Sequence, residues 1–189
     1  MMELTCTIEN NGFNAYFFSG TIQPNKAMIC LGASGCNEAT SMVIAKQFIK
    51  AGFNVLVLGF YMWKGMSKEL RRIPVEYVEN AVKWLKTEKQ IETIGVTGVS
   101  TGAGYALLSA SLIPDISAVM VASPYDYVME ACQPPKKHDR KMLHWNESVY
   151  TFRGEDITFT PWYTVEPDLS ELHRRENEDK SYGSARECR

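Results

Sequence analysis

Gly98, Ser100 and Gly102 constrain the fold of this chain more than any other residues, because they place a serine between two glycines at a change of secondary structure. An apolar, β-rich run, 91–99, leads into this Gly-x-Ser-x-Gly pattern, and a small-residue helical run, 103–112, follows it. Glycine on both sides lets the backbone cross itself without a Cβ clash. The pattern therefore predicts a strand, a sharp turn that projects the Ser100 hydroxyl, and a helix.

Strand and helix patterns alternate along the first two thirds of the chain. An antiparallel hairpin is expected around Asn10-Asn11-Gly12, with arms 5–9 and 14–18. The buried strands expected next are 27–31, 54–59, 91–99 and 116–122, and the helices between them are about 37–50, one from about 74, and 103–112. Near-continuous apolar strands are typical of a sheet that is covered on both faces. This alternation predicts an α/β fold, a three-layer sandwich around a mostly parallel sheet.

The alternation stops after residue 123, which divides the chain into two parts. We expect one domain over 1–189, with a core of about 1–125 and a cap-like insertion and tail over about 126–189. A small hairpin is expected around 153–156, with arms 149–152 and 157–160.

Composition limits the partners and the compartment. The net charge of −2 gives no electrostatic basis for binding nucleic acid, and no apolar run is long enough to span a membrane. The N-terminus lacks the basic and apolar regions of a signal peptide, which predicts a cytoplasmic protein. The five cysteines are scattered and include no CxxC pair, so we expect reduced thiols, with no metal and no cofactor.

The serine pattern favours nucleophilic catalysis, because such a turn aims helix N–H groups at the place where an oxyanion forms. One amide of the oxyanion hole is expected from Thr101. The other is expected from Ser34 or Gly35, in the small-residue loop after the strand 27–31. The structural alternatives are that the glycines only serve tight turns and that Ser100 is idle.

A serine hydroxyl needs a base, and the sequence shows none in an obvious place. His138, His144 and His173 all lie downstream of Ser100, but none follows an apolar strand, so the pattern favours polar surface or cap positions over a catalytic role for all three. Asp168 and His173 are in the order that a serine triad requires, but they are five residues apart on one expected helix. If this chain supplies the base, His173 and His138 are the first residues to test.

Four segments in register, 28–35, 51–56, 73–85 and 94–102, resemble one family. They are similar to the C-terminal hydrolase domain of acyl-CoA thioesterases and bile acid-CoA:amino acid N-acyltransferase, relatives of the dienelactone hydrolases with an α/β-hydrolase fold. The resemblance implies acyl transfer from a thioester to water or an amine through an acyl-enzyme. Ser100 matches the family's nucleophile, and the segment 32–35 matches its oxyanion loop.

The chain also departs from this family. It lacks the N-terminal β-sandwich of eukaryotic members, and Thr101 stands where relatives often have Lys. The strands and the Gly-His motif that carry the family's acid and histidine are not found, so the chain is expected to be C-terminally truncated and to lack the last strands of the sheet. A strand at 116–122 without an outer neighbour would favour a homo-oligomer.

Three functions follow as hypotheses. The first is an acyl-thioester or ester hydrolase or acyltransferase acting through a serine acyl-enzyme, which is inactive as this chain alone unless another segment completes its catalytic set. The second is a non-catalytic α/β-hydrolase-like binding module or remnant. The third is a serine peptidase of the prolyl-oligopeptidase type, for which the chain lacks the propeller domain.

Overall fold

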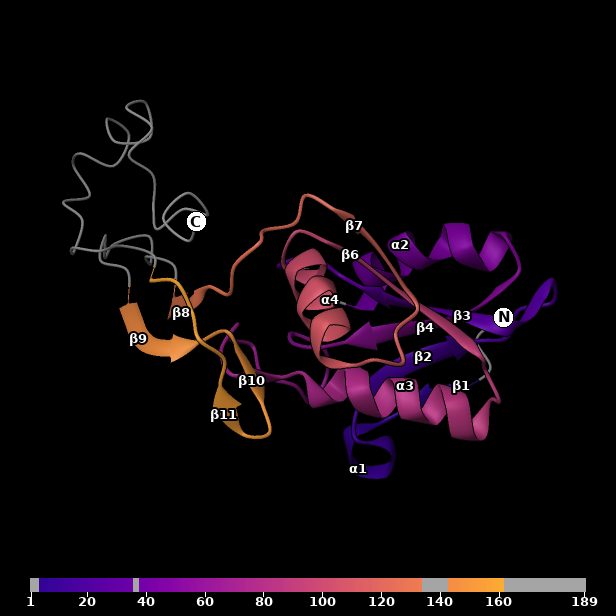
Figure 1. The fold of residues 1–189 in the computed structure, drawn as a ribbon, viewed down its shortest axis with the longest axis horizontal. Helices are drawn as coiled ribbons and strands as arrows, with labels where there is room; N and C mark the ends of the chain where they lie inside the picture. The colour runs from indigo at the N-terminus through magenta and orange to yellow at the C-terminus, as the bar shows by residue number, and fades with distance from the viewer. Residues whose placement is uncertain (1–3, 36–37, 134–142, 162–189) are drawn as a thin grey trace. The chain divides into compact units, whose positions relative to one another are not determined.

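The computed structural model describes residues 4–35, 38–133 and 143–161 (Figure 1). The chain forms two compact units. Unit 1 contains residues 1–68 and 74–125, and unit 2 contains residues 69–73 and 126–189. Unit 1 carries the serine turn and the loop with which it was expected to act.

Unit 1 is built on a six-stranded sheet in the order β1-β2-β4-β3-β6-β7. The strands are β1 (Leu4–Cys6), β2 (Asn14–Phe18), β3 (Gln23–Leu31), β4 (Phe53–Gly59), β6 (Thr93–Val99) and β7 (Ala118–Ala122). The last four are parallel to one another, whereas β2 is antiparallel to both β1 and β4. Because the parallel strands run the same way, the loops that follow them leave from one edge of the sheet. The predicted α/β fold with a mostly parallel sheet is confirmed.

Helices cover both faces of this sheet (Figure 1). On one face, α2 (Glu38–Lys50) packs Ala45 and Phe48 against a cluster that includes Val55 and Val57 of β4. On the other face lies α3 (Glu76–Glu88), whose Trp84 ring meets the Phe17 ring edge-on at 5.3 Å. Side chains alternate between the two faces along each strand, so a run that is apolar at every position fills both layers of the core.

The expected N-terminal hairpin is present, but a short helix interrupts its turn. β1 pairs with β2, with Leu4 opposite Phe17. Between them, α1 (Ile8–Asn11) begins at Thr7, whose hydroxyl accepts a hydrogen bond from the Asn10 amide, and ends at Gly12 with φ 76°. The Asn-Asn-Gly signal therefore marks a helix end with a left-handed glycine rather than a two-residue turn.

Pro74 was expected to start a helix, and this was wrong by two residues. Ile73–Pro74 forms the short strand β5, and the Ile73 amide donates to the Val149 carbonyl at 2.8 Å. The helix α3 begins at Glu76 instead. Pairing satisfies the amide just before the proline, whose own nitrogen has no hydrogen to donate.

Unit 2 contains two small antiparallel arrangements. The strand β8 (Glu130–Gln133) pairs with β9 (Leu143–Ser148), in a region for which no strand was predicted. The predicted hairpin is β10 (Tyr150–Phe152) with β11 (Glu155–Asp156), so its second arm starts earlier than expected. Arg153 and Gly154 both have positive φ, 56° and 83°, as a two-residue type I′ turn requires.

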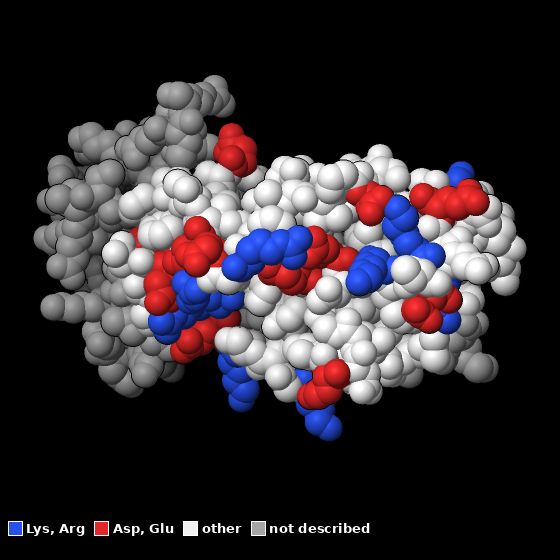
Figure 2. Space-filling model, turned by 60° about the horizontal axis from the view of Figure 1, so that its bottom comes forward, with Lys and Arg blue, Asp and Glu red and all other residues white. Residues whose placement is uncertain are grey.

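Charged side chains of both signs are interspersed on the face that Figure 2 shows. Oppositely charged side chains also form ion pairs. In unit 2, Arg71 forms a two-pronged ion pair with Glu147, at 2.6 and 3.1 Å, and its guanidinium lies 4.8 Å from the centre of the Trp145 ring. The Arg71 hydrogen bond lowers the pKa of Glu147, so this carboxylate is held in its charged form.

Candidate active site

Ser100 occupies the predicted turn between β6 and α4 (Thr101–Leu112), with φ 52° and ψ −115°. Its amide donates to the Ala122 carbonyl at 3.0 Å, and its own carbonyl accepts from the Ala103 and Gly104 amides. A non-glycine residue in this region of backbone space stores about 1–3 kcal/mol of strain. The fold therefore fixes Ser100, a half-exposed residue, at the first turn of a helix in a conformation that a serine with only a structural role has little reason to adopt.

The two glycines of the pattern are required by close backbone contacts. A Cβ on Gly98 would lie 2.2 Å from the Gly102 carbonyl oxygen, and a Cβ on Gly102 would lie 2.0 Å from the Gly32 carbonyl oxygen. Neither neighbour is a side chain that could turn away. The same contacts bring the start of the loop 32–35 against the first turn of α4.

The loop 32–35 follows β3 at the edge of the sheet where Ser100 follows β6. The two strands are adjacent and parallel, and Leu31 is opposite Gly98. Within the loop, the Gly35 amide donates to the Tyr61 hydroxyl at 2.7 Å. Of the two loop residues that the sequence suggested for an oxyanion hole, Gly35 thus already has its amide bonded to a side chain, and Ser34 is exposed.

Tyr125 also contacts the serine turn, and no pattern in the sequence predicted this contact. Its hydroxyl donates to Oγ1 of Thr101 at 2.9 Å and also shares a side-chain hydrogen bond with Ser100. Its ring lies over Gly104, where an added Cβ would come within 2.9 Å of two ring carbons. Burial raises the pKa of Tyr125, and the hydrogen bonds to Thr101 and Ser100 oppose that rise. The phenol is therefore un-ionised near neutral pH.

The histidines considered as bases belong to the sequence after residue 125. His138 and His173 are outside the described residues. All three histidines of the sequence follow residue 125, so unit 1 contains none.

Among the residues that the structure describes, no three His, Cys, Asp or Glu side chains gather where they could hold a metal ion. Within the same residues, no helix is long and apolar enough to cross a membrane.

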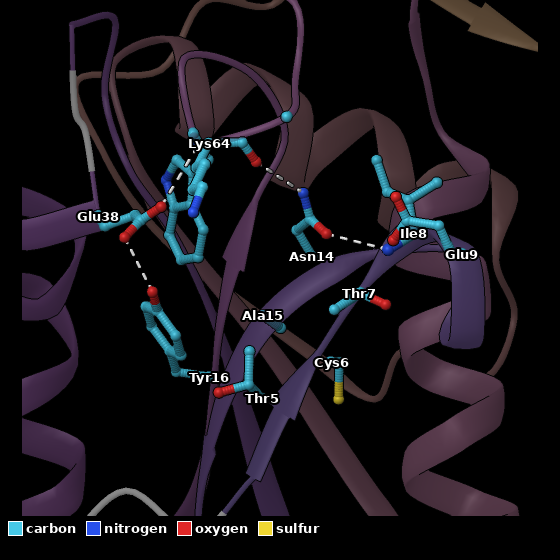
Figure 3. A pocket seen from close by; sticks show the side chains of 12 residues that line it. Thr5, Cys6, Thr7, Ile8, Glu9, Asn14, Ala15, Tyr16, Glu38 and Lys64 are labelled. Carbon is cyan, nitrogen blue, oxygen red and sulfur yellow. Dashed lines mark hydrogen bonds between the residues drawn. The ribbon is translucent and has the colours of Figure 1, made fainter.

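A separate pocket of about 430 Å³ lies in unit 1 among β1, β2, the start of α2 and the loop after β4 (Figure 3). Glu38 accepts hydrogen bonds from the Tyr16 hydroxyl at 2.8 Å and from the Lys64 amide at 3.3 Å, as the dashed lines in Figure 3 mark. The Tyr16 and Trp63 rings lie 5.3 Å apart. None of the predicted site residues that the structure describes (Ser34, Gly35, Ser100 and Thr101) lines this pocket, so it is distinct from the serine turn.

Cys6 lies on the wall of that pocket, and Cys30 belongs to the buried cluster that includes Val55 and Val57. Both are free thiols and both are buried. Burial raises the pKa of the Cys6 thiol to about 11, and Lys89 offsets part of that rise. Burial also raises the pKa of Cys30 well above its usual value. Both thiols are protonated near neutral pH and are poor nucleophiles.

The mostly parallel sheet, with a strained serine between strand and helix, is similar in fold to solved α/β hydrolases and esterases. A Pyrococcus furiosus esterase matches with a TM-score of 0.52 and 23% identity, over 59% of this chain and 47% of the esterase. The Penicillium alpha/beta hydrolase GrgF matches with a TM-score of 0.52 and 18% identity, over 62% of this chain and 43% of that protein. At these identities the likeness establishes the fold.

A comparison with protein families gives a more specific match than the fold does. Residues 73–157 match the family described as BAAT / Acyl-CoA thioester hydrolase C terminal, which confirms the resemblance seen in the sequence. Mouse peroxisomal succinyl-coenzyme A thioesterase is 37% identical over 71 residues, which are 36% of this chain and 17% of that enzyme. The matched part is therefore about a sixth of the length of this relative.

Proposed function

We propose that this chain carries a serine-dependent acyl-transfer site for an acyl-CoA thioester or a related ester. The observation that carries the proposal is Ser100 itself, held at φ 52° between β6 and α4. The family match supports a thioester substrate, because the relatives are named for hydrolysing acyl-CoA.

In the proposed reaction, Ser100 Oγ attacks the thioester carbonyl carbon and forms a tetrahedral intermediate. The carbon–sulfur bond then breaks, the thiol leaves with the serine proton, and the acyl group remains as an ester on Ser100. Water or an amine attacks this ester, releases a carboxylic acid or an amide, and returns the proton to Ser100. Each step conserves the acyl group and involves no oxidation.

We propose that the backbone amides of Thr101 and Ser34 donate hydrogen bonds to the oxyanion of each intermediate. Thr101 opens α4, where helix N–H groups carry partial positive charge, and the loop 32–35 begins against the same helix turn. Gly35 is the weaker candidate, because its amide donates to Tyr61 and would have to leave that bond.

This mechanism also needs a group that accepts the Ser100 proton. Unit 1 contains no histidine, so a histidine base must come from the segment after residue 125 or from another chain. Loss of the base from a serine triad costs about 10⁴–10⁶-fold in rate and leaves only oxyanion stabilisation and binding. None of the three histidines in that segment follows an apolar strand, so we expect slow turnover by this chain alone. The same observation favours a second function, binding of an acyl thioester without turnover.

The experiment is incubation with acyl-CoA thioesters of graded chain length and measurement of released CoA thiol. Ser100→Ala is the test variant. Ser111→Ala is the matched control, because Ser111 is an exposed serine of α4 whose hydroxyl donates to the Leu108 carbonyl of its own helix. Slow release that Ser100→Ala abolishes and Ser111→Ala preserves supports the acyl-enzyme. Release that survives Ser100→Ala contradicts it. Binding without release supports the second function, and release at ordinary enzyme rates would make His173 and His138 the next residues to replace.

A further inference from the structure

Tyr125 is linked to the serine turn by three separate features of unit 1. Its hydroxyl donates to Thr101 Oγ1 at 2.9 Å, it shares a hydrogen bond with the Ser100 side chain, and its ring lies on Gly104. Two of these contacts, with Thr101 and Gly104, lie three residues apart in the first turn of α4, and the third is with the serine that precedes the helix. Tyr125 follows β7, and β7 is the sheet neighbour of β6, so the fold delivers this side chain beside the nucleophile.

We propose that Tyr125 is a positioning residue, whose phenol selects the rotamer of Ser100 from which Oγ attacks. This inference rests on the proposed function. A serine side chain has three staggered χ1 rotamers, and the strained backbone of Ser100 fixes the position of its Cα but not the choice of rotamer. A rigid partner that is itself held by Thr101 and by a ring contact with Gly104 restricts the hydroxyl to one of them.

The phenol acts here by hydrogen bonding and not as a base. Burial keeps it protonated at neutral pH, so it has no capacity to take the Ser100 proton there. The competing explanation is structural: the ring fills space on α4, and the hydroxyl merely satisfies Thr101. The two explanations differ in what removal of the hydroxyl alone would do, because Tyr125→Phe keeps the ring on Gly104.

The kinetic test uses a fluorophosphonate probe and the full chain. Tyr125→Phe is expected to lower the maximal rate of Ser100 modification roughly tenfold while the probe concentration for half-maximal rate stays the same, as loss of one hydrogen bond to the reacting group predicts. Tyr77→Phe is the control: this half-buried tyrosine of α3 lies outside the site, and its labelling rate should match the wild type. Equal maximal rates for Tyr125→Phe and wild type would overturn the positioning role.

A second measurement tests the contact even if Ser100 is unreactive. The ring-carbon NMR signal of Tyr125, assigned by its absence in Tyr125→Phe, is titrated in the wild type and in Ser100→Ala. The pKa of Tyr125 should be higher in Ser100→Ala, because the serine hydroxyl no longer stabilises the phenolate. An unchanged pKa overturns the inference. A raised pKa together with an unlabelled wild type sustains the contact and overturns the proposed function instead.

Discussion

Gly102 lies so close to Gly32 that a Cβ on Gly102 would stand 2.0 Å from the Gly32 carbonyl oxygen. This contact joins the turn that carries Ser100 to the loop that begins after β3. The two segments are about 70 residues apart in sequence, and they meet because β3 and β6 are parallel neighbours that end at the same edge of the sheet. The glycine is thus needed for the site and for the fold at once.

Gly102→Ala should therefore destabilise unit 1 by about 3 kcal/mol, because a backbone oxygen has to move. Urea unfolding measures this change. Gly65→Ala is the matched control, since Gly65 has φ 80° and open space around its missing Cβ, and only the backbone cost of about 1 kcal/mol applies. Equal losses in the two variants would show that the contact with Gly32 is not a constraint.

The strain at Ser100 predicts that two substitutions differ in stability. Glycine adopts a positive φ without strain, whereas alanine at position 100 keeps the strain. Ser100→Gly should therefore be more stable than Ser100→Ala by about 1 kcal/mol, even though glycine raises the entropy of the unfolded chain. Ser111→Gly and Ser111→Ala provide the comparison inside α4, where the order should reverse, because glycine is unfavourable in a helix. Chemical denaturation of the four variants decides the point, and the same order at both sites would mean that Ser100 is unstrained.

Cys6 makes stability fall at alkaline pH. Its pKa is raised from 9.0 to about 11 in the folded chain, so below pH 9 the thiol is protonated in both states and its contribution to stability is complete. Between pH 9 and about 11 the unfolded chain loses the proton first, and the contribution is lost. Urea unfolding at pH 8.5 and 10.5 should show a smaller pH effect in Cys6→Ala than in the wild type; identical pH effects would count against the buried, protonated thiol.

The exposed edge of the sheet predicts self-association. Among the described residues, β7 pairs only with β6, and Met120 at its centre is 50% exposed. An unpaired apolar edge tends to bind another strand. Light scattering over a concentration series should show association that Met120→Lys weakens. Val43→Lys, at a 63% exposed position on α2, should leave it unchanged. A monomer at every concentration would end this expectation.

Apolar periodicity predicted the strands and helices of unit 1 well, because a doubly covered sheet demands continuous apolar runs such as β4. It did not predict β8 and β9, which lie in a polar segment. The serine turn was predictable because glycine spacing records a local steric need. Tyr125 was not, since its contacts with Thr101 and Gly104 join residues more than 20 positions apart and require no particular sequence pattern.

The residue that a fluorophosphonate modifies identifies the nucleophile of this chain. The folded wild-type chain is treated with the probe, digested, and its peptides are mapped by mass spectrometry, beside Ser100→Ala and urea-unfolded protein. We expect one phosphonylated residue, Ser100, in the folded wild type and no modification in the other two samples, because reactivity depends on the strained turn and on the amides of α4 and the loop 32–35. An unmodified wild type, or a label on another serine that persists in Ser100→Ala, would contradict the assignment of Ser100 as the nucleophile.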